Sequence, residues 1–313
     1  MDDSSISRLT RPALLLIAVL WLHFFWCLVP SWRFGEYYEY GFMVPPLAFA
    51  FAWQRIGLMA GVEARPWLPG KRWDLLMTAG WLLLALTMIP LRVIETGDPL
   101  WRPPLHLHGI AVTAVTHLLL ARIKGWRFSV FLMPVTLFAW SAVPYLGQIE
   151  AALVRNLTGI VISLSREGFL LFGQPVEQIG ERLVLGGEVV DVTDGCSGIR
   201  SFQSLLMAAL FFGELLGLKA GWRVMMVAVA VGIAILTNTG RAIYLASVRF
   251  SRGPEAFEAV HDSAGHVAFG LAALVMLVTA KLFTGTWFTP RSGKRVLVRR
   301  STAGPELPPP PSA

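Results

Sequence analysis

The sequence predicts an all-α polytopic membrane protein of about eight transmembrane helices, and three observations support this fold class. Apolar residues make up 55% of the chain and charged residues only 15%, well below the roughly 25% of an average soluble domain. The apolar residues gather in runs of about 17–20 residues, the length of a membrane-spanning helix. Basic residues lie between the runs and many of the 12 Trp residues lie near their ends, as expected at the membrane interfaces.

The candidate spans follow one another with short polar connections, and several contain Pro or Gly, which a helix bundle tolerates in a membrane. The first run follows Arg8 and Arg11 as a signal peptide would, but no small-residue cleavage site comes after it. We therefore expect this run to be retained as a span. The predicted spans are residues 12–29, 41–58, 75–94, 105–120, 128–146, 202–218, 222–244 and 264–283.

The basic clusters predict the orientation of the spans, because loops rich in Lys and Arg stay in the cytoplasm. If every cluster is cytoplasmic, both termini are cytoplasmic and the segment between the fifth and sixth spans lies on the outer side. The loops after the seventh span and before the eighth then have the same outer location as that segment. The clusters lie at residues 8–11, 55–72, 122–127, 219–223 and 291–300.

The segment 151–172 is apolar, but a ninth span here would break the alternation of the basic loops. As a helix it places Leu157 and Val161 on an apolar face and Arg155 and Arg166 on a polar face. We therefore predict an amphipathic helix that lies in the outer membrane interface. Residues 181–192 alternate around Gly186-Gly187, which predicts a short hairpin.

The hairpin leads into a polar, glycine-punctuated turn that carries Cys196, one of two cysteines, at the start of an apolar helix. Unpaired N–H groups and the positive dipole end of a helix start favour a thiolate, which is the nucleophilic form of cysteine. Arg200 follows one helical turn later. From spacing alone, an ordinary small residue remains the alternative interpretation of Cys196.

Two later motifs contain candidate partners for the cysteine. Arg241 follows Asn238 near the outer end of the seventh span; it is either an interfacial arginine or a group that stabilises an oxyanion. His261 and Asp262 open the last span, where Asp262 would serve as a helix cap and His261 as a proton shuttle. His266 lies further along, and the chemistry alone does not choose between the two histidines.

Other kinds of site find no support in the sequence. Two cysteines make no disulfide framework, and we identify no CxxC and no Cys/His spacing typical of a metal site. His106, His108 and His117 are not spaced as ligands on one helix face, and Cys27 is interpreted as an inert thiol in an apolar run. We expect no metal and no cofactor. The net charge of +7 belongs to loops that orient helices, so we expect a lipid bilayer and no nucleic acid as partner.

Taken together, the motifs resemble the exosortase/archaeosortase family of multispanning membrane cysteine transpeptidases. The resemblance covers most of the chain from Leu157 onward and the multispan layout before it. It rests on Val192 and on three motifs in this order: Cys196-Ser197-Gly198-Ile199-Arg200-Ser201, Asn238-Thr239-Gly240-Arg241 and His261-Asp262-Ser263-Ala264-Gly265.

The resemblance implies a nucleophilic Cys196 with Arg241 and His261 as catalytic partners. Supporting roles fall to Ser197, Gly198, Arg200, Asn238 and Asp262. It also implies membrane-anchored substrates with a C-terminal sorting signal of the PEP-CTERM type, cleaved at the outer, periplasmic face of the bacterial inner membrane. The new carboxyl end would pass to a lipid or polysaccharide acceptor, or to water, in cells that produce exopolysaccharide.

We expect one exosortase-like membrane domain, followed by a basic, Pro-rich cytoplasmic tail. Two alternative functions remain. Gly195-Cys196-Ser197-Gly198 also fits the GxSG motif of a rhomboid-like serine protease, with Ser197 as nucleophile and His266 as base. The polar motifs would otherwise line a path in a non-catalytic component of exopolysaccharide export. The expected divisions are residues 1–285 for the membrane domain, 1–148 for five spans, 149–201 for the interfacial segment and cysteine loop, 202–285 for three spans, and 286–313 for the tail.

Overall fold

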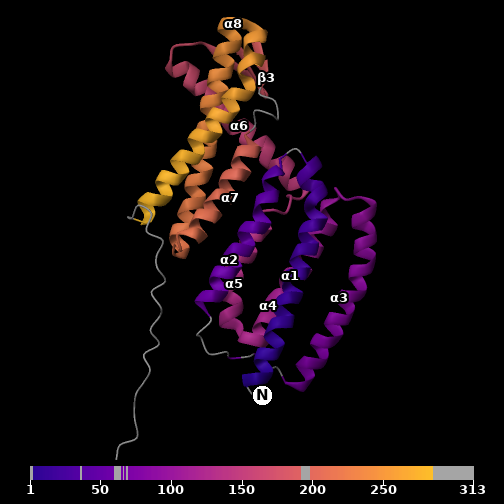
Figure 1. Cartoon of the computed structure of the whole chain (residues 1–313). Helices are drawn as coiled ribbons and strands as arrows, with labels where there is room; N and C mark the ends of the chain where they lie inside the picture. Colours follow the sequence, from indigo (N-terminus) through magenta and orange to yellow (C-terminus); the bar gives the residue numbers. More distant parts are fainter. Residues whose placement is uncertain are drawn as a thin grey trace, which may run out of the picture.

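The computed structural model describes residues 3–35, 37–59, 65, 67, 70–191 and 198–284, which fold into eight α-helices, one 3-10 helix and a three-stranded sheet. Each of the eight predicted apolar runs is helical. Figure 1 shows an N-terminal bundle below and a C-terminal group of elements above it. The cysteine at position 196, its neighbours 192–197 and the tail beyond residue 284 lie outside the described residues.

The N-terminal bundle surrounds an aromatic and aliphatic core that includes Phe24, Leu28, Leu105 and Phe138, each at most 1% exposed. Proline pairs begin α2 and α4, where the missing N–H groups cost nothing. α3 packs on the side of α4 (Figure 1), and Leu83, Leu86 and Ile89 are among its exposed apolar residues. The elements are α1 (Asp3–Phe34), η1 (Glu39–Met43), α2 (Val44–Leu58), α3 (Lys71–Gly97), α4 (Arg102–Lys124) and α5 (Trp126–Trp140).

The predicted amphipathic segment forms a helix, α6 (Gly147–Leu171). Its apolar side chains divide between two faces: Leu157 and Val161 are buried within the protein, whereas Ile160 and Leu164 are more than 40% exposed. Three unlike faces, one packed, one apolar and one polar, suit a helix that lies on a membrane surface. This membrane location remains a prediction.

An antiparallel sheet of order β1-β2-β3 follows α6. Its strands are β1 (Val176–Ile179), β2 (Arg182–Leu185) and β3 (Glu188–Asp191). The predicted hairpin is confirmed as β2 and β3, joined by Gly186 (φ 57°) and Gly187 (φ 87°), because two positive φ angles give the turn that matches strand twist. Strand β1 was not predicted.

The last two helices are α7 (Ile199–Leu215) and α8 (Ala220–Thr284). Gly253 (φ 83°, ψ −178°) breaks α8 before Pro254 and turns it into a helical hairpin, whose two arms lie side by side in Figure 1. Met226 on the first arm and Met276 on the second are buried in one core with Leu205 of α7. Both arms extend past the predicted span ends, so the expected loop before Ala264 is helix and Asp262 is not a helix cap.

Within the described residues, three helical stretches are long and apolar enough to cross a membrane: Arg11–Phe34, Arg102–Lys124 and Ala220–Phe283. The last contains both arms of the α8 hairpin. The helix at Trp126–Trp140 is apolar but short, because the run predicted to extend to residue 146 ends in turns after residue 140. The protein is therefore a helical membrane protein, and the count of eight spans remains a prediction.

An ion network joins the two groups of helices. Glu214 of α7 accepts hydrogen bonds from Arg55 of α2, with Nη2 at 2.8 Å, and from Nη1 of Arg223 in α8 at 2.5 Å. The Glu214 side chain is 5% exposed. Two guanidinium groups on one buried carboxylate hold α2, α7 and the base of α8 together.

Candidate functional site

The α8 hairpin brings together two of the predicted catalytic residues. Arg241 on the first arm lies with its Nη2 atom 3.3 Å from Nε2 of His261 on the second arm. Arginine has no acceptor atom, so Nε2 accepts this hydrogen bond and the ring proton sits on Nδ1. Nδ1 in turn lies 3.3 Å from Oδ1 of Asp262, whose side chain is 93% exposed. Arg241 precedes Gly253 by 12 residues and His261 follows it by eight, so the pair lies about 12–18 Å from the turn at 1.5 Å per helical residue.

A glycine leaves space beside the Arg241 guanidinium. Gly265 lies one helical turn after His261, on the same face of the second arm. A Cβ atom there would lie 3.5 Å from Nη2 and 3.6 Å from Cζ of Arg241. The absence of a side chain lets the guanidinium lie against the helix backbone while it contacts His261.

The end of the cysteine loop rests on the helix that carries Arg241. Gly198, two residues after Cys196, adopts a left-handed conformation (φ 75°, ψ 7°). A Cβ atom at this position would lie 2.6 Å from Cγ and Nδ2 of Asn238. Asn238 is 5% exposed and precedes Arg241 by three residues, nearly one turn. Glycine is therefore required here both by its backbone angle and by the close side chain.

The three-stranded sheet packs on α8 and thereby positions β3, the strand that precedes the cysteine loop. A Cβ atom at Gly186 would lie 2.2 Å from the Phe250 ring, so the turn between β2 and β3 sits directly on the α8 hairpin. Leu183 and Leu185 of β2 are buried with Leu245 of α8. Asp191 and Gly198, the described residues on either side of the cysteine loop, thus belong to elements that pack on α8.

The other predicted residues occupy different positions. His266 is exposed and lies about 140° around the helix from His261, since each residue turns a helix by about 100°. The structure therefore brings His261, not His266, to Arg241. Arg200 is exposed in the first turn of α7. Cys196 and Ser197 fall outside the described residues.

One buried polar residue near the cysteine loop, Gln203, was not predicted from the sequence. Gln203 is 1% exposed in the second turn of α7, and both its amide atoms are buried without a hydrogen bond in the described structure. A buried amide without a partner is costly. An amide side chain one turn after the loop, just before an apolar run of the same helix, was the available signal.

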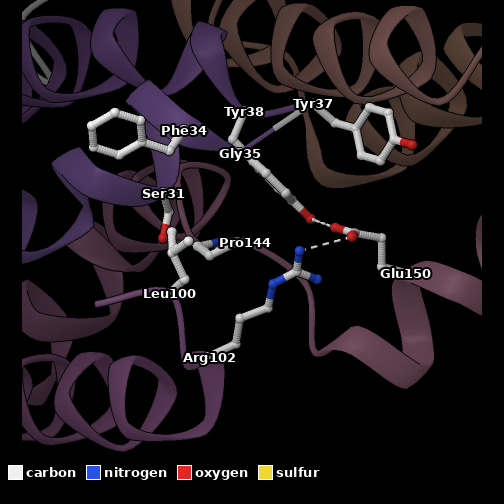
Figure 2. A pocket seen from close by; sticks show the side chains of 9 residues that line it. All are labelled: Ser31, Phe34, Gly35, Tyr37, Tyr38, Leu100, Arg102, Pro144 and Glu150. Atoms are coloured by element: carbon white, nitrogen blue, oxygen red, sulfur yellow. Dashed lines mark hydrogen bonds and ion pairs between the residues drawn. The ribbon is translucent and has the colours of Figure 1, made fainter. Parts of the chain in front are cut away.

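A separate pocket of about 200 Å³ opens between the ends of α1, α4 and α6 (Figure 2). Arg102 Nη2 pairs with Glu150 at 2.8 Å, and the Tyr38 hydroxyl donates to the same carboxylate. Burial and the bond to Glu150 raise the pKa of Tyr38, so its hydroxyl remains a donor at ordinary pH. The charges that line this pocket are already paired with each other.

The fold and the Arg–His pair define a helical membrane protein with a polar site between the arms of a hairpin. A family model described as transmembrane exosortase (Exosortase EpsH) matches residues 32–278. The match extends from the end of α1 through both arms of α8, and the chain belongs to the transmembrane exosortase family. This membership supports a membrane transpeptidase in general. The comparisons with curated proteins and with solved structures give no match.

Proposed function

We propose that the protein is a membrane-embedded cysteine transpeptidase that cleaves C-terminal sorting signals of the PEP-CTERM type. The observation that carries the proposal is the Arg241–His261 contact at 3.3 Å, with Gly198 seated against Asn238 on the same helix. Cys196 precedes Gly198 by two positions, which is at most about 7.6 Å of chain. Chain connectivity thus supports a position of Cys196 near the pair.

In the proposed reaction His261 Nε2 takes the proton from the Cys196 thiol, and the thiolate attacks the scissile carbonyl. Arg241 leaves Nε2 and donates to the oxyanion of the tetrahedral intermediate. His261 then gives its proton to the departing amine, so the C–N bond breaks and a thioester remains. Asp262 beside Nδ1 orients the ring, and Asn238 and Gly198 position the loop.

An acceptor with an amine or hydroxyl group resolves the thioester by the reverse steps, with His261 taking the acceptor's proton. The acceptor is a lipid or polysaccharide of the envelope; water in its place would make the protein a protease. The predicted topology supports this scheme. A substrate with one span and a cytoplasmic basic cluster presents its cleavage motif on the periplasmic face, where the predicted topology places the α8 turn.

The test is co-expression with a PEP-CTERM reporter, followed by reporter size on a gel. We expect Cys196→Ala, Arg241→Ala and His261→Ala each to leave the reporter uncut. Ser197→Ala and the matched control His266→Ala should still cut it. Loss of cleavage with Ser197→Ala and His266→Ala but not with Cys196→Ala would instead indicate a rhomboid-like serine protease. Tolerance of all five substitutions would exclude this site.

A further inference from the structure

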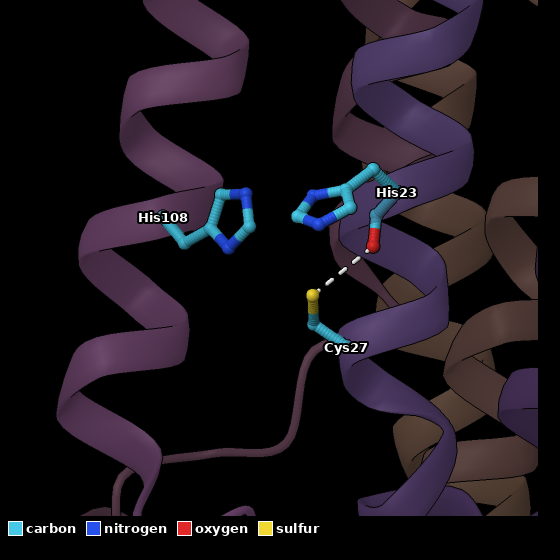
Figure 3. A group of neighbouring side chains, drawn as sticks. All are labelled: His23, Cys27 and His108. Carbon is cyan, nitrogen blue, oxygen red and sulfur yellow. Dashed lines mark hydrogen bonds between the residues drawn. The ribbon is translucent and has the colours of Figure 1, made fainter. Parts of the chain in front are cut away.

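Three metal-ligating side chains meet inside the N-terminal bundle, far from Arg241. They are His23 and Cys27 of α1 and His108 of α4, and their ligand atoms all lie within 4.8 Å of one another. Figure 3 shows the thiol and both rings directed into the same space between the helices. Cys27 is 8% and His108 3% exposed. His23 is exposed, so the group is enclosed by protein at Cys27 and His108 and open on the His23 side.

The spacing along α1 explains how one helix supplies two of these groups. His23 and Cys27 are four residues apart and lie on the same helix face. This spacing was not among the patterns considered for a metal site in the sequence. His108 lies 81 residues after Cys27, so the third member becomes visible only when α4 packs against α1.

A buried carboxylate orients the third ligand. Nδ1 of His108 lies 2.9 Å from Oε1 of Glu95 on α3, and Glu95 is 4% exposed. A carboxylate on one ring nitrogen fixes the tautomer and leaves Nε2 for a metal, as in the carboxylate–histidine–metal arrangement. Arg92 also binds Glu95 and lies with Nη1 2.9 Å from the Cys27 Sγ atom. Its side chain is 33% exposed, which gives it room to move when the thiol binds another cation.

We propose that His23, Cys27 and His108 bind a transition-metal ion of the zinc class, with the fourth position open. Imidazole and thiolate are the ligands that such borderline ions prefer. Zn–N and Zn–S bonds of about 2.0–2.3 Å in a tetrahedron separate neighbouring ligand atoms by roughly 3.3–3.7 Å. The observed separations need to close by about 1 Å, a change that side-chain rotation supplies.

Metal binding would connect the three helices that carry the ligands and their carboxylate partner. The ion replaces the proton of the Cys27 thiol, and the thiolate opposes one of its two positive charges while Glu95 remains shared by His108 and Arg92. In the predicted topology this site lies toward the outer ends of α1, α3 and α4. The proposal does not depend on the proposed peptidase function.

The test uses the purified full chain in detergent, with Cys196→Ala so that Cys27 is the only thiol. After treatment with a chelator, Co²⁺ is titrated and the thiolate-to-cobalt charge-transfer absorption is followed. We expect a saturable band that Zn²⁺ removes by competition. Cys27→Ser should abolish the band, His23→Gln and His108→Gln should weaken binding strongly, and Glu95→Gln should weaken it about 10- to 100-fold.

His106→Gln is the matched control, because His106 is on the same helix but its Nδ1 atom bonds to the carbonyl of Arg102. It should bind Co²⁺ as the parent does. A second measurement guards against misfolded variants: Zn²⁺ should raise the Tm of the parent and of His106→Gln but not that of Cys27→Ser. No band in the parent, or a band that survives Cys27→Ser, would overturn the proposal.

Discussion

The N-terminal bundle and the α8 hairpin both bury polar groups, but they hold them in different ways. In the bundle, and where it joins α7 and α8, the charged groups lie in close pairs or triads, such as Glu95 between Arg92 and His108 and Glu214 between Arg55 and Arg223. In the hairpin Arg241 meets an imidazole across a long 3.3 Å contact, with Gly198 and Gly265 nearby. Charges that are neutralised in place stabilise a fold, whereas an arginine that contacts an imidazole keeps N–H groups that can also donate to a substrate.

The largest expected effect on activity comes from Arg241→Lys. Lysine keeps the charge but loses the planar fork that reaches both His261 and an oxyanion, so cleavage of the reporter should fall about 10²- to 10³-fold. Single-turnover cleavage in membranes measures this effect. The melting temperature in detergent should change less than the activity, because lysine keeps the positive charge. If Arg241→Lys instead lowered the melting temperature and kept its specific activity, Arg241 would serve the fold in the way that the paired charges do, and the comparison between the two regions would fail.

The opposite pattern is expected for Glu214→Gln. This change leaves Arg55 and Arg223 buried without their carboxylate, and breaking a buried pair costs about 3–5 kcal/mol. Thermal unfolding in detergent should show the loss, while cleavage per folded molecule stays close to wild type. Lys219→Gln, nearby at the exposed end of the helix connection, is the matched control and should leave the melting temperature unchanged.

Gly198→Ala tests whether the loop end is fixed by Asn238. The left-handed backbone costs a non-glycine residue about 1–2 kcal/mol, and the new Cβ would meet Asn238 at 2.6 Å. We expect a lower melting temperature and slower cleavage. Adding Asn238→Ala should relieve the steric part of the stability loss but not the backbone part, which a double-mutant cycle measures. Strict additivity of the two changes would show that the residues do not contact each other.

The smallest effect is expected for Gly265→Ala. Its Cβ atom would lie 3.5 Å from Arg241, an ordinary contact, and alanine favours a helix over glycine by up to about 1 kcal/mol. The melting temperature should therefore rise slightly, with cleavage reduced only a few-fold. A loss of activity as large as that of Arg241→Lys would mean that the guanidinium has to move through this space.

The sequence predicted those features that depend on local pattern. Apolar runs predicted all eight helical stretches, and Gly186-Gly187 predicted the hairpin of β2 and β3. The motif order identified Arg241 and His261 as partners, and the structure places them in contact. The full length of the helical hairpin was not predicted. Residues 245–263 are polar enough to suggest a loop, but in the structure both arms continue to Gly253.

Features that depend on packing between distant segments were not predicted. The choice of His261 over His266 follows from which face of the second arm meets the first arm. The seat of Gly198 on Asn238 joins positions 40 residues apart. The cluster of His23, Cys27 and His108 joins α1 to α4. The periodicity of the sequence does not indicate which of these distant residues come into contact.

The two ends of the first arm of α8 are anchored unequally. Arg223 at the base is locked to Glu214, and Arg241 lies 18 residues further along, about 27 Å at the rise of an α-helix. Leu245 and Phe250, further along the arm, pack on the sheet. The Arg241–His261 contact thus lies between an ionic anchor and an apolar anchor of the same helix.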